Sequence, residues 1–222
     1  MLNTFLWIAL GVAAVNWVSV KREWTIVKIV TKPLVIVFLL GWLWQNGITG
    51  REMTWFSLGL VFSLAGDIFL LAPGDKLFLA GLIAFLMAQI AYILGFNSVF
   101  PRANLWVIFL SACLVIIAIE LYRRLNQGLI SQKAEAMRLP VALYTCVITG
   151  MALSAILNLT RPGWDWQHAM ITVLGAVSFM FSDSLLAWNK FVKSTPHAAL
   201  MVIITYHLGQ IGVVLGVALH WG

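Results

Sequence analysis

The sequence predicts an all-α integral membrane protein with eight transmembrane helices, on the strength of its composition and of its apolar runs. Its 222 residues are 62% hydrophobic and 10% charged, with a mean hydropathy of +0.96. A soluble domain is about half apolar and about a quarter charged. The apolar runs are continuous, whereas the strands of a membrane barrel alternate, and a lipid-facing helix satisfies its own backbone hydrogen bonds.

Eight runs are long enough to cross a bilayer, which takes about 20 mostly apolar residues. They cover residues 3–20, 27–45, 55–72, 77–98, 103–122, 139–157, 167–188 and 198–219. Short polar breaks such as KREW and APGDK separate them, and the longest break, RRLNQGLISQKAEAMR, has room for a short surface helix. No basic residue precedes the first run, which favours a membrane helix over a cleaved signal peptide. Residues 1–222 are therefore expected to form a single transmembrane domain.

The basic residues predict the orientation of the chain. With eight spans both termini lie on one side of the membrane, and that side receives only Arg51, Arg102 and Arg161. The opposite side receives the other eleven of the 14 Lys and Arg residues: Lys21, Arg22, Lys28, Lys32, Lys76, Arg123, Arg124, Lys133, Arg138, Lys190 and Lys193. Because Lys and Arg accumulate in cytoplasmic loops, we expect both termini outside the cytoplasm, in a bacterial inner membrane.

The two halves of the chain resemble each other. The fourth and eighth runs contain QIAYILG and QIGVVLG, beginning at Gln89 and Gln210, and the third and seventh contain Asp67 and Asp183. The second opens with Lys32-Pro33 and the sixth with an Arg-Leu-Pro segment. Matched segments four helices apart run in the same direction, so they predict two parallel halves, residues 1–98 and 103–219. Chance similarity between apolar segments is the alternative.

Several classes of function find no support in the sequence. A net charge of +6 is expected from cytoplasmic loops in a membrane protein, so it does not indicate a nucleic-acid partner. The two cysteines lie in apolar runs and form neither a disulfide framework nor a metal-ligand spacing. No hydrolase elbow and no phosphate-binding loop is present.

Five of the eight acidic residues lie in loops and Glu120 lies at a helix end, which leaves Asp67 and Asp183 well inside membrane spans. An acid at the centre of a membrane helix costs about 2.5–3.5 kcal/mol to insert, and such residues usually serve function. Each is expected five residues before the cytoplasmic end of its helix, about 7–8 Å inside the boundary at 1.5 Å per residue. A structural hydrogen bond between helices is the alternative role.

Other polar residues are expected in the same layer. Tyr144, Tyr206, Gln89 and Gln210 lie within the sixth, eighth, fourth and eighth spans, and their alternative role is to hold helices together. Lys32 and Lys190 would form a basic rim, or serve only as topology determinants. A cavity with this rim, two acids below it and an apolar floor suits an amphiphile with a phosphate headgroup.

At this point the residues resemble a known family. Ser182-Asp183 followed by LLAWNKF, together with Asp67 in SLAGD, Lys32-Pro33 and FLMAQIAY, is similar to the YhhN-like lysoplasmalogenase family over nearly the whole chain. The resemblance implies hydrolysis of the vinyl ether of lysoplasmalogens, with Asp67 and Asp183 as the catalytic acids and a lysophospholipid as the partner. It adds Asn189, beside Lys190, to the candidate substrate ligands. Gln89 departs from the family, where many members are expected to carry His.

The chemistry of a vinyl ether fits two carboxyl groups. Hydrolysis needs a proton donor to the β-carbon, a base for water and negative charge near the resulting cation, and it needs no metal or organic cofactor. Two close carboxyls in an apolar site do not both ionise readily, so one keeps its proton. Lys190 follows Asp183 by seven positions on one helix face and would favour its ionised form, which predicts Asp67 as the donor.

Two other classes of protein fit some of the same residues. Parallel repeats and acids within the membrane also suit a proton-coupled secondary transporter of a small amphiphile. A structural membrane protein with a satisfied acid pair is the third alternative. The expected position of both acids toward one leaflet, rather than at the midplane, favours the enzyme.

Overall fold

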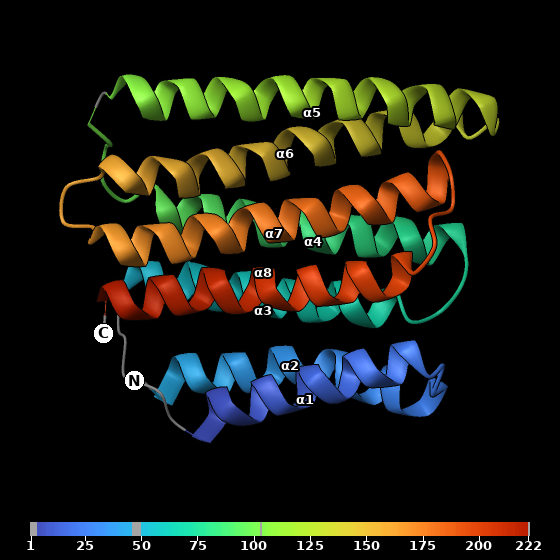
Figure 1. Cartoon of the computed structure of the whole chain (residues 1–222), viewed down its shortest axis with the longest axis horizontal. Helices are drawn as coiled ribbons and strands as arrows, with labels where there is room; N and C mark the ends of the chain where they lie inside the picture. The colour runs from blue at the N-terminus through green and yellow to red at the C-terminus, as the bar shows by residue number, and fades with distance from the viewer. Residues whose placement is uncertain (1–3, 46–49, 103, 222) are drawn as a thin grey trace.

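The computed structural model describes residues 4–45, 50–102 and 104–221. Eight α-helices in these residues lie side by side with their axes roughly parallel, as Figure 1 shows. They are α1 (Thr4–Lys21), α2 (Thr25–Gln45), α3 (Arg51–Phe69), α4 (Asp75–Phe96), α5 (Leu105–Ser131), α6 (Arg138–Leu157), α7 (Trp166–Phe191) and α8 (Ala198–Trp221). Two short 3-10 helices, η1 (Glu135–Met137) and η2 (Asn158–Thr160), flank α6. The expectation of an all-α fold is confirmed.

Seven of the helices in the described residues are long and apolar enough to cross a membrane. The one left out is α3, whose apolar residues are diluted by Glu52 near its start and Asp67 near its end. In Figure 1, α3 nevertheless runs beside its neighbours over most of their length. The chain is therefore a multi-pass membrane protein, and α3 is the helix that departs most from membrane composition.

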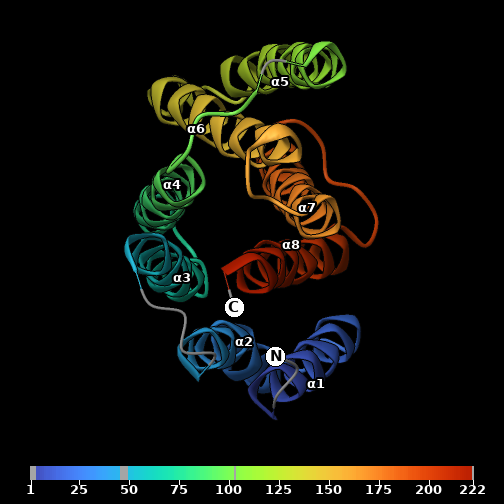
Figure 2. The ribbon, with the colours of Figure 1, turned by 90° about the vertical axis from the view of Figure 1, so that its left-hand side faces the viewer.

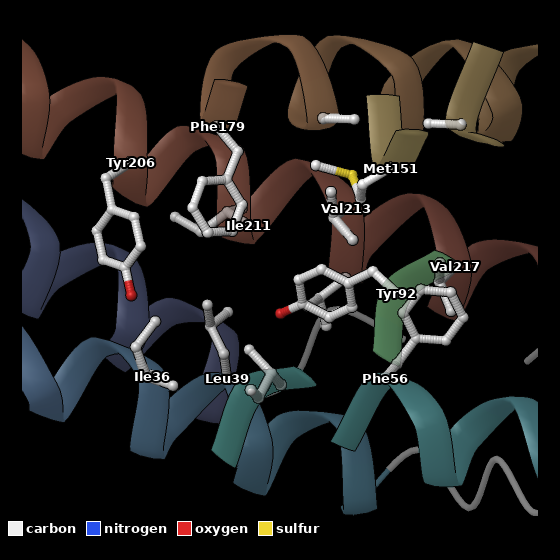
Figure 3. Packing of buried hydrophobic residues seen from close by; sticks show 14 of the residues in the cluster. Ile36, Leu39, Phe56, Tyr92, Met151, Phe179, Tyr206, Ile211, Val213 and Val217 are labelled. Atoms are coloured by element: carbon white, nitrogen blue, oxygen red, sulfur yellow. The ribbon is translucent and has the colours of Figure 1, made fainter. Parts of the chain in front are cut away.

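The helices form an elongated arrangement rather than a ring. Figure 2 looks along the helices: α1 and α2 lie at one end, α5 and α6 at the other, and α3, α4, α7 and α8 between them. The largest buried cluster extends from α1 and α2 through this middle region to α6. Figure 3 shows part of it, where Tyr206 and Phe179 pack with ring centroids 5.4 Å apart.

Several predicted boundaries were wrong, and the differences have local causes. The fifth run, expected at 103–122, continues as α5 to Ser131, so much of the longest break is a membrane helix extended by apolar Leu125 and Leu129, which pack inward. The surface helix expected there is only η1. The predicted starts at residues 3 and 103, and part of the break between the second and third runs, lie outside the described residues.

The two acids were expected at equal distances from the ends of their helices, and this prediction was wrong. Helix α3 ends at Phe69, only two residues after Asp67, because the chain turns toward Pro73 and the residue before a proline disfavours helix. Helix α7 continues to Phe191, eight residues after Asp183. Their common level must therefore be judged from the pockets they share rather than from helix ends.

Of the sequence similarities between the two halves, the one between the two proline segments does not hold in the structure, and a similarity in helix packing adds to the others. Pro33 does not open α2, which starts at Thr25, so it lies in the helix interior, unlike Pro140 in the first turn of α6. A matched pair of close helix contacts favours the repeat instead.

In each half a residue of the helix before the last one closely approaches a glycine near the end of the last helix. A Cβ added at Gly95 would lie 2.7 Å from the ring of Phe56, and one added at Gly216 would lie 2.1 Å from Thr172. Thr172 follows Phe56 by the same number of residues as Asp183 follows Asp67. We therefore propose that residues 1–98 and 103–219 are equivalent halves.

Superposition tests this proposal directly. In an experimental structure, superposing α1–α4 on α5–α8 should place Asp67 on Asp183 and Gln89 on Gln210. If these pairs fall on different helix faces after superposition, the similarity of the two halves is coincidental.

The orientation in the membrane gives a second prediction. In Figure 1 the start of α1 and the end of α8 lie at the same end of the molecule, opposite the loops that carry most basic residues. A periplasmic reporter fused after residue 222 should therefore be active, and a cytoplasmic reporter at the same position inactive. The reverse pattern would contradict the proposed orientation.

Candidate functional site

The two aspartates line one polar pocket between the helices. Residues of α2, α3, α4, α7 and α8 and of the α3–α4 loop form its walls, and its polar lining is Lys32, Asp67, Ser182, Asp183, Lys190 and Tyr206. The pocket opens at the end of the molecule where α3 meets α4 and α7 meets α8. The predicted juxtaposition of two acids under a basic rim is therefore present in the structure.

Asp67 is held in an ion pair. Its carboxylate is fully buried and lies 3.0 Å from the Nζ atom of Lys32, whose side chain is 18% exposed. The Tyr206 hydroxyl donates a hydrogen bond of 2.8 Å to the other carboxylate oxygen. Phe85 and Phe179 hold the Tyr206 ring edge-on at 5.7 and 5.4 Å between centroids. Both oxygens of this carboxyl group are therefore in polar contacts, one with a cation and one with a hydroxyl donor.

Asp183 has a different environment. The Tyr144 hydroxyl of α6 donates a short hydrogen bond to Asp183 Oδ2. Among the described residues, no Lys, Arg or His forms an ion pair with this carboxyl group. Its side chain is partly exposed, whereas Asp67 is fully buried. Of the two acids, Asp183 is the one that a molecule in the pocket can touch.

The sequence predicted that Lys190 would stabilise the ionised form of Asp183, but Lys190 forms its ion pair with another residue. Its Nζ atom lies 3.1 Å from Asp75 Oδ1, at the start of α4, and 4.4 Å from the ring centroid of Phe78. Seven residues put Lys190 and Asp183 on one face of α7 but about 10 Å apart along its axis. The predicted assignment of the proton to Asp67 assumed that Lys190 lies beside Asp183, and the structure contradicts this assumption.

A second, apolar pocket meets the first at Asp183. It lies between α4, α5, α6 and α7 and is lined mostly by Leu, Phe, Val, Ile and Met side chains, with Tyr144, Thr145, Asp183 and Ser184 as its polar members. Five residues line both pockets: Asp183, Leu70, Phe78, Phe85 and Leu186. Asp183 therefore stands on the boundary between a polar and an apolar compartment.

The polar compartment continues toward the loops. A neighbouring pocket shares Lys32, Leu186 and Val202 with it and adds Lys28, Asn189 and His197. The Asn189 amide is already used, because it donates to the Leu185 carbonyl at 2.7 Å and accepts from the Thr195 backbone at 2.7 Å. These hydrogen bonds tie the last turn of α7 to the loop that follows it, so Asn189 stabilises the wall of the pocket.

The glutamines lie deeper than the two pockets. The Gln210 amide accepts from the Tyr92 hydroxyl at 2.7 Å and donates to Ser63 at 2.8 Å, and all three side chains are buried. Gln89 is also fully buried, and its amide lies near the Tyr144 hydroxyl without a hydrogen bond of regular geometry to any described residue. Neither glutamine lines the polar or the apolar pocket.

Sequence reasoning missed four participants in these networks. Ser63 precedes Asp67 by four residues and Tyr92 follows Gln89 by three, so helical spacing from the chosen residues would have found them. Phe85, which holds Tyr206, and Asp75, which pairs with Lys190, had no comparable signal. Both contacts join helices that only the tertiary fold brings together.

The comparisons with known proteins agree with one another. Residues 27–217 match the family model described as the YhhN family. The human protein named lysoplasmalogenase TMEM86B is 30% identical over 83% of this chain and 72% of its own length. Its mouse counterpart is 29% identical over 90% and 78%, and human lysoplasmalogenase TMEM86A is 28% identical over 90% and 78%. No solved structure shows a significant match.

Proposed function

The chain belongs to the YhhN family, and from that premise we propose that it is a lysoplasmalogenase that cleaves the vinyl ether bond of lysoplasmalogens. The products would be a fatty aldehyde and a glycerophospho-choline or -ethanolamine. The observation that carries the proposal is the position of Asp183, hydrogen-bonded to Tyr144 between a basic polar pocket and an apolar pocket. A lysolipid bound with its headgroup in one and its chain in the other presents its vinyl ether to this carboxyl group.

The first chemical step is protonation of carbon by Asp183. The carboxyl proton goes to the β-carbon of the vinyl ether, the double-bond electrons form the new C–H bond, and an oxocarbenium ion remains at the α-carbon. A positioned general acid typically contributes about 10²–10⁴-fold to such a step. The Tyr144 hydroxyl orients the carboxyl group and stabilises the carboxylate left behind.

Water then completes the reaction. Its oxygen adds to the α-carbon, and the Asp183 carboxylate takes one of its protons, which restores the acid. The hemiacetal loses the glycerol oxygen, its hydroxyl proton passes to that oxygen, and the aldehyde forms. Each turnover consumes one water and leaves the protein unchanged.

Asp67 contributes charge rather than contact in this proposal. Its carboxyl group is paired with Lys32 and closed off by Tyr206, and because Lys32 compensates its charge we take it to be the acid that is negative beside Asp183. A second negative charge in a low-dielectric site favours the protonated form of its neighbour and stabilises the cation that follows. This assigns the proton donor to Asp183, the reverse of the assignment made from the sequence.

Aldehyde release from defined lipids tests the proposal. The purified protein in detergent should release aldehyde from 1-alkenyl lysophosphocholine or lysophosphoethanolamine, and none from the matched saturated ether. In D₂O the aldehyde should carry one deuterium at the carbon beside the carbonyl, because that carbon receives the proton. Absence of aldehyde with both lipids would refute the function, and aldehyde without deuterium would refute carbon protonation. Transport of the lipid without aldehyde would instead support a carrier.

Lys190 offers a test of the headgroup position. It lines the polar pocket, and its ion pair is with the exposed Asp75, a kind of pair worth about 0–1 kcal/mol. Lys190→Gln should therefore leave the melting temperature nearly unchanged and raise KM for the lysolipid more than it lowers kcat. Asp75→Asn breaks the same ion pair but keeps the cation, so it should not raise KM. A pure loss of kcat in Lys190→Gln would contradict a phosphate-binding role.

A further inference from the structure

The apolar pocket is too shallow for the chain of a membrane lipid. Its floor is formed by Phe85, Ile148 and Met180. Met180 lies three residues below Asp183 on α7, and Ile148 four below Tyr144 on α6, which is about 4.5–6 Å at 1.5 Å per residue. A chain that reaches the bilayer midplane crosses about 15 Å, half of the hydrocarbon core. A chain that continues toward the midplane from the level of Asp183 therefore extends beyond these residues.

A second depression adjoins the apolar pocket at Thr145 of α6. It runs along the seam between α5 and α6, and we call it the seam groove. Its apolar part is lined by Val115, Ala118, Cys146, Gly150 and Leu153, and its end toward the basic loops by Tyr122 and Arg123. Thr145 lines both the seam groove and the apolar pocket. It adjoins Tyr144 in the sequence, so the two spaces meet at the level of the Asp183 carboxyl group.

The seam groove has the length that the apolar pocket lacks. Leu153 lies nine residues beyond Tyr144 on α6, or about 13.5 Å deeper at 1.5 Å per residue. This depth is close to the thickness of one leaflet. The depression exists because Ala118, Cys146 and Gly150 have small side chains or none. Figure 2 shows that α5 and α6 lie at the outer edge of the molecule.

From this continuity we propose that the seam groove binds the distal part of the substrate's alkenyl chain, which leaves the apolar pocket past Thr145 and lies between α5 and α6. The inference rests on the proposed function for the identity of the lipid. It adds a binding site for a long hydrocarbon chain that reaches the bilayer, so chain length beyond the pocket floor affects catalysis through the seam groove alone.

Substitutions that fill the groove test this through chain length. Cys146→Phe and Gly150→Leu add bulk in the groove, and a Cβ at Gly150 first meets Ile93 Cδ1 at an ordinary 3.5 Å. Displacing about two methylene groups, at about 0.8 kcal/mol each, should lower kcat/KM roughly tenfold for a 1-hexadecenyl lysolipid. A 1-hexenyl lysolipid, which ends near the pocket floor, should be cleaved as by the unmodified protein. Leu143→Phe is the matched control, since Leu143 faces outward on the same helix outside the groove.

Equal losses for both chain lengths, or none for either, would overturn the inference while leaving the function intact. Failure of the unmodified protein to cleave either lipid would instead refute the function.

A photoreactive probe gives a readout that needs no cleavage. A saturated lyso ether phosphocholine with a diazirine at the chain end should label residues 115–122 of α5 and 142–153 of α6. A short-chain version should label the pocket floor. Labelling of the floor by the long probe, or uniform labelling of all outward faces, would overturn the proposed chain position.

Discussion

Asp183→Asn is expected to remove vinyl-ether cleavage almost completely, with a loss of at least about 10²–10⁴-fold in kcat. Asparagine is nearly isosteric with aspartate and can still accept the hydrogen bond from Tyr144, so the fold should stand. It cannot give a proton to carbon or take one from water. The measurement is aldehyde release in detergent, beside a melting curve that shows the variant folded.

The matched changes define what this loss means. Asp75→Asn alters an exposed acid outside the reaction centre and should keep most activity. Asp67→Asn should also be nearly inactive, and the double variant should be little worse than either single one, because groups that act as a unit are not additive. Substantial cleavage by a folded Asp183→Asn protein would make the proposed proton donor wrong.

The second large effect is expected at Lys32. Lys32→Gln leaves the fully buried Asp67 carboxylate without its cation, and breaking a buried pair in this way typically costs about 3–5 kcal/mol. We therefore expect a large drop in melting temperature together with loss of activity. Lys190→Gln, whose partner is exposed, should show no comparable drop.

A double variant separates the stability effect from the catalytic one. Lys32→Gln with Asp67→Asn removes both charges, so the protein should regain much of its thermal stability because no uncompensated charge is buried. It should remain inactive, since the negative charge beside Asp183 is gone. Recovery of activity along with stability would show that Asp67 has only a structural role.

The sequence alone determined the class of the protein and singled out the two acids of its candidate site. Hydropathy fixed the number of helices and nearly all of their positions, because insertion into a bilayer is a local property of each apolar run. The cost of a carboxyl group in lipid singled out Asp67 and Asp183 without any structure. The third and seventh helices are four short connections apart and therefore run in the same direction, which predicted that the two acids lie toward the same side of the membrane.

What the sequence left open was the partner of each polar group. Lys190 was assigned to Asp183 because both lie on one face of α7, yet its ammonium group reaches Asp75 on α4, while Lys32 of α2 reaches Asp67. Spacing along one helix reports which residues share a face, but it does not report which neighbouring helix packs against that face. The choice of proton donor depended on this point.

The shape of the lipid site was likewise decided only by the tertiary structure. Neither the boundary position of Asp183 between two pockets nor the continuation past Thr145 into the seam between α5 and α6 has a signal in the sequence. Both arise where side chains of several helices fail to fill the space between them. Packing of that kind is a property of the assembled helices, so the sequence determined which residues carry charge in the membrane, and the fold decided what each charge meets.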